Sequence, residues 1–310
     1  MKKKMLSFVS LGLVFITFFL SCMTKNPDEE EQLNTALEVP EKIISNAAAA
    51  TLFQNDHTTR LSQIGAEKTS FEDKAIHFEL DAITKYITHL EKLATTKNIP
   101  ITGVSFIFGA DSTGKRTAFI MPSTRNASLD YQESFTVENG QFLTFKHIDC
   151  SLKLKNNSQN DENIVLSPNG YLSFNDATRL FNQYQTQYIE PFQAKVTKEY
   201  YTKAVWYSLA EIKGYINYLK KKSNEHNLSI TGIDVFFGVY NNDSSLELKS
   251  NAQTVFLTAS SRQQSIINFK NKSLQSFIQN DFFLKETNND NTDESLAFNM
   301  GHLSPPPPKK

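Results

Sequence analysis

The chain has 310 residues, with 32 Lys and Arg against 33 Asp and Glu, so its net charge is −1 and no positive field favours nucleic acid as a partner. Two cysteines cannot form a disulfide framework, and with six scattered histidines they argue against structural zinc, so we expect no metal and no cofactor. Stability must therefore come from a hydrophobic core, for which 24 Phe and 11 Tyr supply large side chains.

Residues 1–21 have the pattern of a secretory signal peptide. Three lysines precede an apolar run over residues 5–20, which is shorter than the ~20 residues that span hydrocarbon. The small residue Ser21 is followed by Cys22, and this arrangement resembles a bacterial lipobox, in which the cysteine is acylated after cleavage. We therefore expect a lipoprotein that is held on the bilayer, in part by palmitate, through Cys22.

Two other interpretations of this segment remain open. Ordinary signal peptidase cleavage would leave Cys22 as an incidental thiol, although Phe19 is large where that enzyme requires a small residue. An uncleaved membrane anchor is disfavoured because the apolar run is short.

Residues 22–43 read as an acidic tether. Lys25 and the acidic run over residues 28–31 resemble the surface-export signal of Bacteroidota lipoproteins, while a solvated, self-repelling linker is the alternative interpretation. We expect the protein to be lipid-anchored at the outer membrane, on its periplasmic face or at the cell surface.

The rest of the chain contains an internal duplication. Residues 74–109 align without a gap with residues 203–238, at an offset of 129. The identical pairs include Leu80/Leu209, Ile83/Ile212, Tyr86/Tyr215, Ile87/Ile216, Leu90/Leu219, Asn98/Asn227, Gly103/Gly232 and Gly109/Gly238. The match continues upstream at offset 128 and downstream at offset 137, where residues 166–168 and 303–305 are both Leu-Ser-Pro. The sequence predicts two homologous tandem domains, 44–168 and 169–285, and a polar, polyproline tail over 286–310.

Each copy predicts the same order of elements. Apolar residues at helical spacing and aromatic or β-branched runs define them. The predicted helices are 44–59 and 79–96 in the first copy and 173–189 and 208–226 in the second. The predicted strands are 101–108 and 117–121, and 230–237 and 254–258. Asn98 and Asn227 are expected to end the longer helices. The expected fold class is α+β, with two helices followed by an antiparallel hairpin or small sheet in each domain.

Two motifs suggest chemistry that their contexts do not support. Residues 109–115 match the start of a phosphate-binding loop, but Arg116 replaces the required hydroxyl and a strand follows where a helix is needed, so we predict a hairpin turn. His147, Asp149 and Cys150 are metal-type side chains, but no second cluster completes a ligand set and a plain strand is the better interpretation. No residue is assigned a catalytic role, and the role of Cys150 is open.

One symmetric group of residues is a candidate binding groove. Arg125 and Arg262 follow the second strand of each copy, and with Tyr86 and Tyr215 they are predicted to line a groove between the copies. The alternative is that the arginines cap loops while the tyrosines pack their rings and hydrogen-bond locally.

The duplicated unit also carries a family resemblance. Its features are Tyr86-Ile87 and Tyr215-Ile216, the Thr-Gly pairs at 102–103 and 231–232, the Phe-Gly pairs at 108–109 and 237–238, and the closing segment 299–306. In these it resembles uncharacterised tandem-repeat lipoproteins of Bacteroidota, especially flavobacteria. The resemblance implies export and anchoring but no activity.

We expect a pseudo-dimer in which Phe106, Phe108, Phe236 and Phe237 lie between the copies. The favoured function is a module that binds an unidentified ligand, protein or glycan. The alternative is an exported hydrolase with its site in the cleft between the two repeats. An enzyme would keep a working site in one copy only, whereas the sequence shows no polar cluster that one copy has and the other lacks.

Overall fold

The computed structural model describes residues 39–65, 75–126, 128–129, 131–138, 141–147, 161–162, 164–196, 201–260, 295–299 and 301–304. The chain divides into two units, residues 1–39 and 40–310, and every element below belongs to the second. The fold is mixed α+β with antiparallel sheets, which confirms the predicted class. Cys22, Cys150 and Arg262 lie outside the described residues.

The first sheet, sheet A, has the strand order β1-β13-β12-β11-β2. Its strands are β1 (Ile43–Ile44), β13 (Ala297–Phe298), β12 (Gln253–Ser260), β11 (Gly232–Val239) and β2 (Ala75–Glu79). Every pairing among them is antiparallel. The strand β2 therefore lies at one edge of this sheet.

The second sheet, sheet B, has the main order β14-β10-β3-β4-β5-β6. Its strands are β14 (His302–Ser304), β10 (Ala204–Ser208), β3 (Ile101–Ala110), β4 (Arg116–Arg125), β5 (Gln132–Glu138) and β6 (Gln141–Phe145). Three short strands complete it: β7 (Asp161–Glu162) beside β5, β8 (Val165–Ser167) beside β4, and β9 (Gly170–Leu172) beside β8. The predicted hairpins β3–β4 and β11–β12 are present, and the second carries the extra 3-10 helix η5 (Ser244–Lys249) in its longer loop.

The helices lie where the repeat predicts them. They are α2 (Asn46–Asp56) with α3 (Ser62–Ile64), α4 (Leu80–Lys97), α5 (Phe174–Tyr184) with α6 (Glu190–Lys195), and α7 (Leu209–Glu225). A π-helical turn, His57–Leu61 and Gln185–Ile189, joins each of the split pairs. The sequence did not predict these turns. Asn98 ends α4 in the left-handed conformation at φ 52° and Asn227 follows α7 with the same φ, as the predicted helix ends required.

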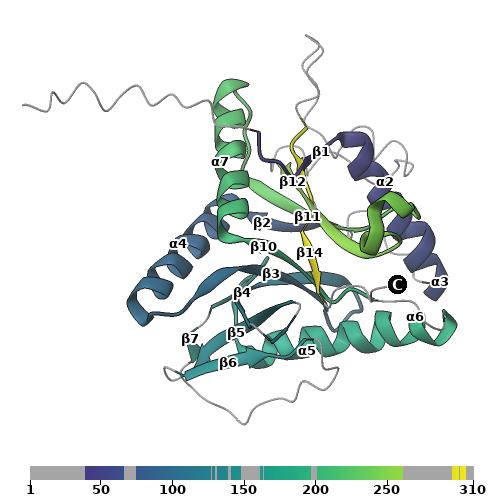
Figure 1. The fold of residues 1–310 in the computed structure, drawn as a ribbon, viewed down its shortest axis with the longest axis horizontal. Coiled ribbons are helices and arrows are strands. Elements are labelled where there is room, and N and C mark those ends of the chain that lie inside the picture. Colours follow the sequence, from purple (N-terminus) through teal and green to yellow (C-terminus); the bar gives the residue numbers. More distant parts are fainter. Residues whose placement is uncertain are drawn as a thin grey trace, which may run out of the picture. The chain divides into compact units, whose positions relative to one another are not determined.

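The two predicted copies exchange elements. The strand β2, from the first copy, pairs with β11 of the second, and β10 of the second copy pairs with β3 of the first. The registers correspond, since Glu79 lies opposite Gly232 and Ser208 lies opposite Gly103. Helix α2 likewise packs on β11 and α5 on β3, as Figure 1 shows. The predicted boundary at residues 168/169 therefore divides the sequence repeats within one compact unit.

The downstream alignment at offset 137 is not followed by the C-terminal strands. Leu166 in β8 pairs with Ile120 of β4. The residue that corresponds to Ile120 in the second copy is Leu257 of β12, and it pairs with Phe298 of β13. Leu303 instead lies in β14, which pairs with β10. The two Leu-Ser-Pro segments thus occupy different places in the fold, one beside β4 and the other beside β10. A match over three residues does not determine which strand a segment pairs with.

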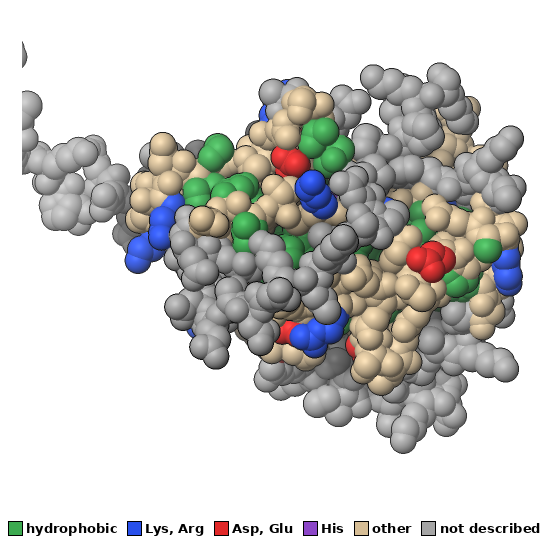
Figure 2. Space-filling model, turned by 90° about the horizontal axis from the view of Figure 1, so that it is seen from below, with side chains coloured by type: hydrophobic (Ala, Val, Ile, Leu, Met, Phe, Trp, Pro, Cys, Tyr) green, Lys and Arg blue, Asp and Glu red, His purple; other side chains and the backbone are tan. Residues whose placement is uncertain are grey.

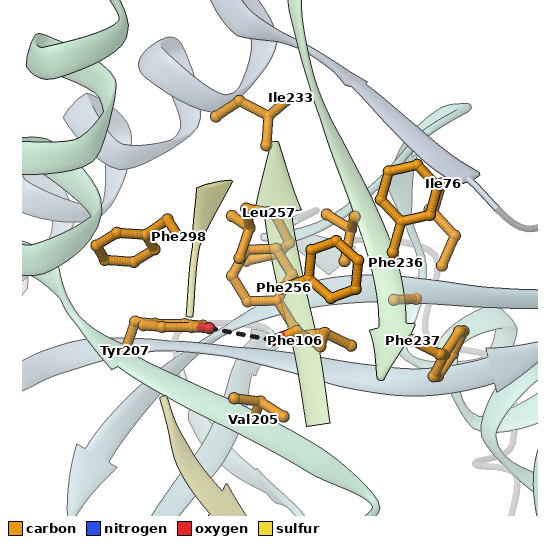
Figure 3. Packing of buried hydrophobic residues seen from close by; sticks show 14 of the residues in the cluster. Ile76, Phe106, Val205, Tyr207, Ile233, Phe236, Phe237, Phe256, Leu257 and Phe298 are labelled. Atoms are coloured by element: carbon orange, nitrogen blue, oxygen red, sulfur yellow. Dashed lines mark hydrogen bonds between the residues drawn. The ribbon is translucent and has the colours of Figure 1, made fainter. Parts of the chain in front are cut away.

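The core fills the space between the two sheets. Facing side chains of both sheets form their inner faces, and Figure 3 shows this packing. The ring of Phe106 lies edge-on to Tyr207 at 5.8 Å, and Phe108 lies edge-on to Phe237 at 4.9 Å. On the opposite, outer face of sheet A, Phe236 meets Phe53 of α2 at 5.9 Å. All four predicted interface aromatics therefore contact the other copy, although Phe236 does so on the outer face.

A glycine allows β3 and β10 to approach closely. A Cβ atom on Gly103 would lie 2.2 Å from the backbone oxygen of Tyr207 and 2.6 Å from Trp206 Nε1. We expect Gly103→Ala to lower the free energy of unfolding by about 1–3 kcal/mol, because the strands must separate to admit the methyl group. Gly214→Ala is the matched control, since no atom outside its own stretch of helix backbone lies within 4 Å of a Cβ there and alanine favours the helix. Urea unfolding of both variants tests this, and equal stability changes would contradict it.

Candidate functional site

The predicted groove is not formed by its tyrosines. Tyr86 and Tyr215 are fully buried, and burial raises the pKa of both hydroxyls. The Tyr86 hydroxyl donates to Ile164 O at 2.7 Å, and the Tyr215 hydroxyl donates to Leu296 O at 2.8 Å. The prediction of these residues as groove-lining is therefore wrong, because each tyrosine is buried and joins its helix to the backbone just before a short strand, β8 for Tyr86 and β13 for Tyr215. Arg125 is exposed at the end of β4.

The segment that resembles a phosphate-binding loop, residues 109–115, forms a hairpin turn between β3 and β4, as predicted. Asp111 Oδ1 accepts hydrogen bonds from the backbone N–H groups of Thr113 and Lys115 at 2.9 and 3.0 Å. Gly114 has φ 88°, a conformation that glycine adopts without strain. The turn returns the chain directly into β4, so no helix N-terminus faces a phosphate position here.

His147 follows β6 and is buried. Its Nε2 lies 2.8 Å from Ser304 Oγ, and its Nδ1 lies 3.3 Å from Phe145 O. Burial lowers the pKa of His147 to about 4, from an ordinary value of 6.5. The ring is therefore neutral in the folded protein at neutral pH, and its two contacts explain it as part of the core.

This histidine predicts a dependence of stability on pH. Between pH 6.5 and about 4 the unfolded chain binds a proton at His147 that the folded chain does not, so the free energy of unfolding falls as the pH falls. The loss across this window is about 3 kcal/mol. Urea unfolding of His147→Gln across the same range should show a correspondingly shallower loss, with exposed His89→Gln as the control. Identical pH profiles for wild type and His147→Gln would contradict the prediction.

A buried polar network joins the two hairpins to the first helix of each copy. Arg116 donates to both carboxylate oxygens of Asp56, at 2.7 and 3.2 Å, and Gln253 Nε2 donates to Asp56 Oδ1 at 3.1 Å. Gln253 Oε1 accepts from the Tyr184 hydroxyl at 3.3 Å. Burial lowers the pKa of Arg116, but the charge and hydrogen bonds of Asp56 raise it by more, so the guanidinium stays charged. This network is closed to solvent and is best explained as structural.

A second polar cluster lies on the outer face of sheet A, and we name it the His77 cluster. His77 Nδ1 is 2.7 Å from Asp234 Oδ1 and 3.1 Å from Ser260 Oγ. His77 Nε2 is 3.7 Å from Glu79 Oε1, which is beyond hydrogen-bond distance. The side chains of His77 and Glu79 are 37 % and 38 % exposed, so part of the cluster is open to solvent, whereas His77 Nε2 itself is buried without a hydrogen-bond partner.

The residues of the His77 cluster come from both copies. His77 is on β2, and Asp234 lies opposite it on the neighbouring strand β11. Ser260 is on the next strand, β12, opposite Gly232. Gly232 leaves room for the ring, since a Cβ there would lie 2.1 Å from His77 Cε1. The pairing of β2 with β11 therefore creates the cluster on the outer face of sheet A, from residues of both copies.

The geometry of the cluster differs from that of a nucleophilic triad. A triad places the carboxylate on one imidazole nitrogen and the hydroxyl on the other. Here Asp234 and Ser260 share Nδ1, so the nitrogen that would take the serine proton is the one that holds the carboxylate. The cluster offers a carboxylate, an imidazole and a hydroxyl for hydrogen bonding to a ligand.

The corresponding position in sheet B has different side chains. At the repeat offsets, Trp206 corresponds to His77, Ser105 to Asp234 and Ser123 to Ser260. Ser105 and Ser123 are buried and hydrogen-bond to each other at 2.7 Å. The expectation that neither copy carries a polar cluster that the other lacks compared the copies one by one, whereas this cluster combines residues of both. The aligned pairs carried this signal, but its meaning depends on the strand exchange.

The described residues show no metal cluster and, on the face drawn in Figure 2, no patch of one charge. Figure 2 shows, on the face that it draws, charged side chains scattered among neutral ones without a patch of one sign. Within the described ranges, no three His, Cys, Asp or Glu residues gather as a metal site would require. None of the helices in those ranges combines the length and apolar character of a bilayer span.

Comparisons with known proteins give no match to a family model, to a curated protein or to a solved structure.

Proposed function

We propose that this protein is an exported lipoprotein, anchored to the outer membrane through acylated Cys22, whose folded unit binds a partner. The observation that carries the binding role is the His77 cluster: a partly exposed set of hydrogen-bonding side chains, present at one of two corresponding positions. The signal and lipobox pattern over residues 1–22 supports the anchor.

The arrangement of the cluster favours binding over hydrolysis. Ser260 has no base of its own, because Asp234 already accepts from the same imidazole nitrogen at the shorter distance. A hydroxyl without a base is a poor nucleophile near neutral pH. The same hydroxyl, imidazole and carboxylate are good partners for a polar or cationic group of a ligand.

An exported hydrolase is the second candidate, and one observation favours it. The two corresponding positions have diverged, with His77, Asp234 and Ser260 in sheet A against Trp206 and serines in sheet B, as expected where one site works and the other decays. This divergence is also compatible with one binding surface per chain.

An activity screen separates the two candidates. Purified protein with Cys22→Ala is assayed on esters, peptides and glycosides, beside the same protein carrying His77→Ala. We expect no turnover from either protein. Turnover that is lost with His77→Ala but kept with the exposed control His89→Ala would overturn the binding role and support the hydrolase.

The anchor is tested separately in cells. We expect wild-type protein to incorporate labelled palmitate and to fractionate with membranes, and Cys22→Ala to do neither. Proteinase treatment of intact cells then locates the folded unit, because only surface-exposed protein is cut while a periplasmic control survives. Membrane fractionation of the Cys22→Ala protein would contradict the anchor.

We also propose that the two halves are homologous domains joined by duplication, with exchanged elements. The identical pairs at one offset and the corresponding registers of β2–β11 and β10–β3 support this. In a fragment of residues 40–172, β2 has no β11 to pair with, but it can pair with β3 of a second copy. We expect this fragment to dimerise in light scattering, and a folded monomer would contradict the proposal.

A further inference from the structure

The strand β2 is an edge strand whose counterpart is covered. Among the described strands, β2 pairs with β11 alone, whereas β10 pairs with β3 on one side and with β14 on the other. Residues 302–304, which form β14, follow the last element of the second copy. The same chain therefore shows how a short strand docks on one of two corresponding edges.

The backbone groups at the β2 edge are placed to accept another strand. Tyr240, directly after β11, donates its N–H to Ala252 O on the β12 side, so the backbone groups of every second residue back along β11 also face β12. The backbone groups of Val235 therefore face β2, where Ile76 lies opposite. Bonded and non-bonded pairs alternate along antiparallel strands, so the N–H and C=O groups of Ile76 face β11 while those of Ala75 and His77 face away from it. An edge with such outward groups is a template for strand addition.

The two edges correspond residue by residue. Ala204, Val205 and Trp206 of β10 lie opposite Ser304, Leu303 and His302 of β14. The corresponding residues of β2 are Ala75, Ile76 and His77. Val205 and Ile76 are both buried on the inner faces, and Trp206 and His77 both lie on the outer faces.

We propose that β2 binds an extended peptide segment of a partner protein as an added antiparallel strand, in the way that β10 holds β14. This inference rests on the proposed binding function and names its ligand class. The peptide has an aliphatic residue opposite Ile76, as Leu303 lies opposite Val205. Main-chain hydrogen bonds give such binding its strength, and alternate side chains give its selectivity.

The His77 cluster sets the charge of the residue before that aliphatic one. This peptide residue lies opposite His77 on the outer face, where the carboxylates of Asp234 and Glu79 stand on either side of the imidazole. Long side chains reach directly opposite and diagonal neighbours across a strand pair. Two carboxylates against one imidazole favour Lys or Arg at this position and disfavour Glu.

The experiment uses a peptide built on β14. Its sequence, Asn-Met-Gly-Lys-Leu-Ser-Pro-Pro, is that of residues 299–306 with Lys in place of His302. Its binding to the detergent-purified, full-length protein is measured by fluorescence anisotropy. We expect saturable binding, and about tenfold weaker binding of the peptide with Glu in place of Lys, with the difference shrinking as salt rises.

Two variants locate the binding on β2. Ala75→Pro removes an outward N–H and leaves the bonds to β11, so it should weaken binding at least about tenfold. Ala75→Val keeps that N–H and should bind as wild type does. Amide exchange of wild-type protein provides the same test without a variant: the peptide should slow exchange at Ala75 and His77. Slowing confined to other strands would overturn the inference.

The outcomes separate this inference from the proposed function. Intact bound peptide, confirmed by mass spectrometry, supports both. Cleavage of the peptide overturns the binding function in favour of the hydrolase. If the peptide is neither bound nor cleaved, the peptide inference is overturned and the proposed binding function is not. A dimer that Ala75→Pro abolishes would also overturn it, since a second copy would then be the occupant of the edge.

Discussion

Replacing Arg116 with Leu is expected to lower the free energy of unfolding by about 3–5 kcal/mol. The substitution leaves the Asp56 carboxylate buried, with Gln253 as its remaining hydrogen-bond donor among the contacts described above. In wild type the two side chains are 7 % and 2 % exposed and form two hydrogen bonds. The loss is large because the uncompensated charge, and not merely a missing contact, has to be accommodated in the core.

The control for Arg116→Leu is an exposed Arg–Asp ion pair. Arg179 lies 2.9 Å from Asp176, but the two side chains are 63 % and 43 % exposed, so Arg179→Leu should change stability little. Adding Asp56→Asn to Arg116→Leu removes the buried charge and should restore part of the loss. Urea unfolding measures all three variants. A loss below about 1 kcal/mol for Arg116→Leu would contradict the structural role of this pair.

Replacing Phe106 with Ala is expected to cost about 3–5 kcal/mol, because this ring lies at the centre of the contact between the sheets. It is 1 % exposed and lies edge-on to both Phe78 and Tyr207, at 6.5 and 5.8 Å. Truncation removes a ring that both neighbours contact and leaves a cavity in the core.

The matched control for Phe106→Ala is Phe142→Ala. Phe142 is 43 % exposed on β6, where it stacks on Phe135 at 4.0 Å. Solvent already reaches this ring, so we expect a loss of about 1 kcal/mol or less. Chemical denaturation of both variants distinguishes the two environments, and equal losses would show that the centre of the core relaxes around Phe106→Ala.

Much of the fold follows from local pattern in the sequence. The apolar stripe of α4 and α7, the asparagines that end their helical runs, and the aromatic runs of β3 and β11 all specify local structure, and the structure confirms them. Strands β2 and β10 were missed because each directly precedes a helix and is five residues long. Alternation over so few residues is hard to distinguish from the start of the helix.

The exchange between copies has no local signature. A gapless repeat gives the period of the chain but not the point at which it crosses from one sheet to the other. The crossing is decided by the sheet in which β2 buries Ile76 and Phe78 and by the sheet in which β10 buries Val205 and Tyr207. Both sheets are built from residues far away in the sequence. Strand pairing between distant segments therefore decides where each structural unit begins and ends along the chain.

The candidate site was missed for the same reason. His77 is 157 residues from Asp234 and 183 from Ser260, so no spacing rule brings them together. The prediction that Tyr86 and Tyr215 line a groove was wrong for a different reason. Both lie on the same buried helix stripe as Ile83 and Ile212, and that position indicates a core role for the rings.

The crossed connections also impose an order on biogenesis. A chain that emerges N-terminus first releases β2 about 150 residues before its partner β11, whereas the strands of sheet B apart from β14 are complete once residue 208 has emerged. Residues 40–79 must therefore wait, with an apolar strand and helix uncovered, while the later half is made. Such a nascent segment is what holding chaperones recognise. The part of the chain that is made first is thus the part that has to be protected for longest.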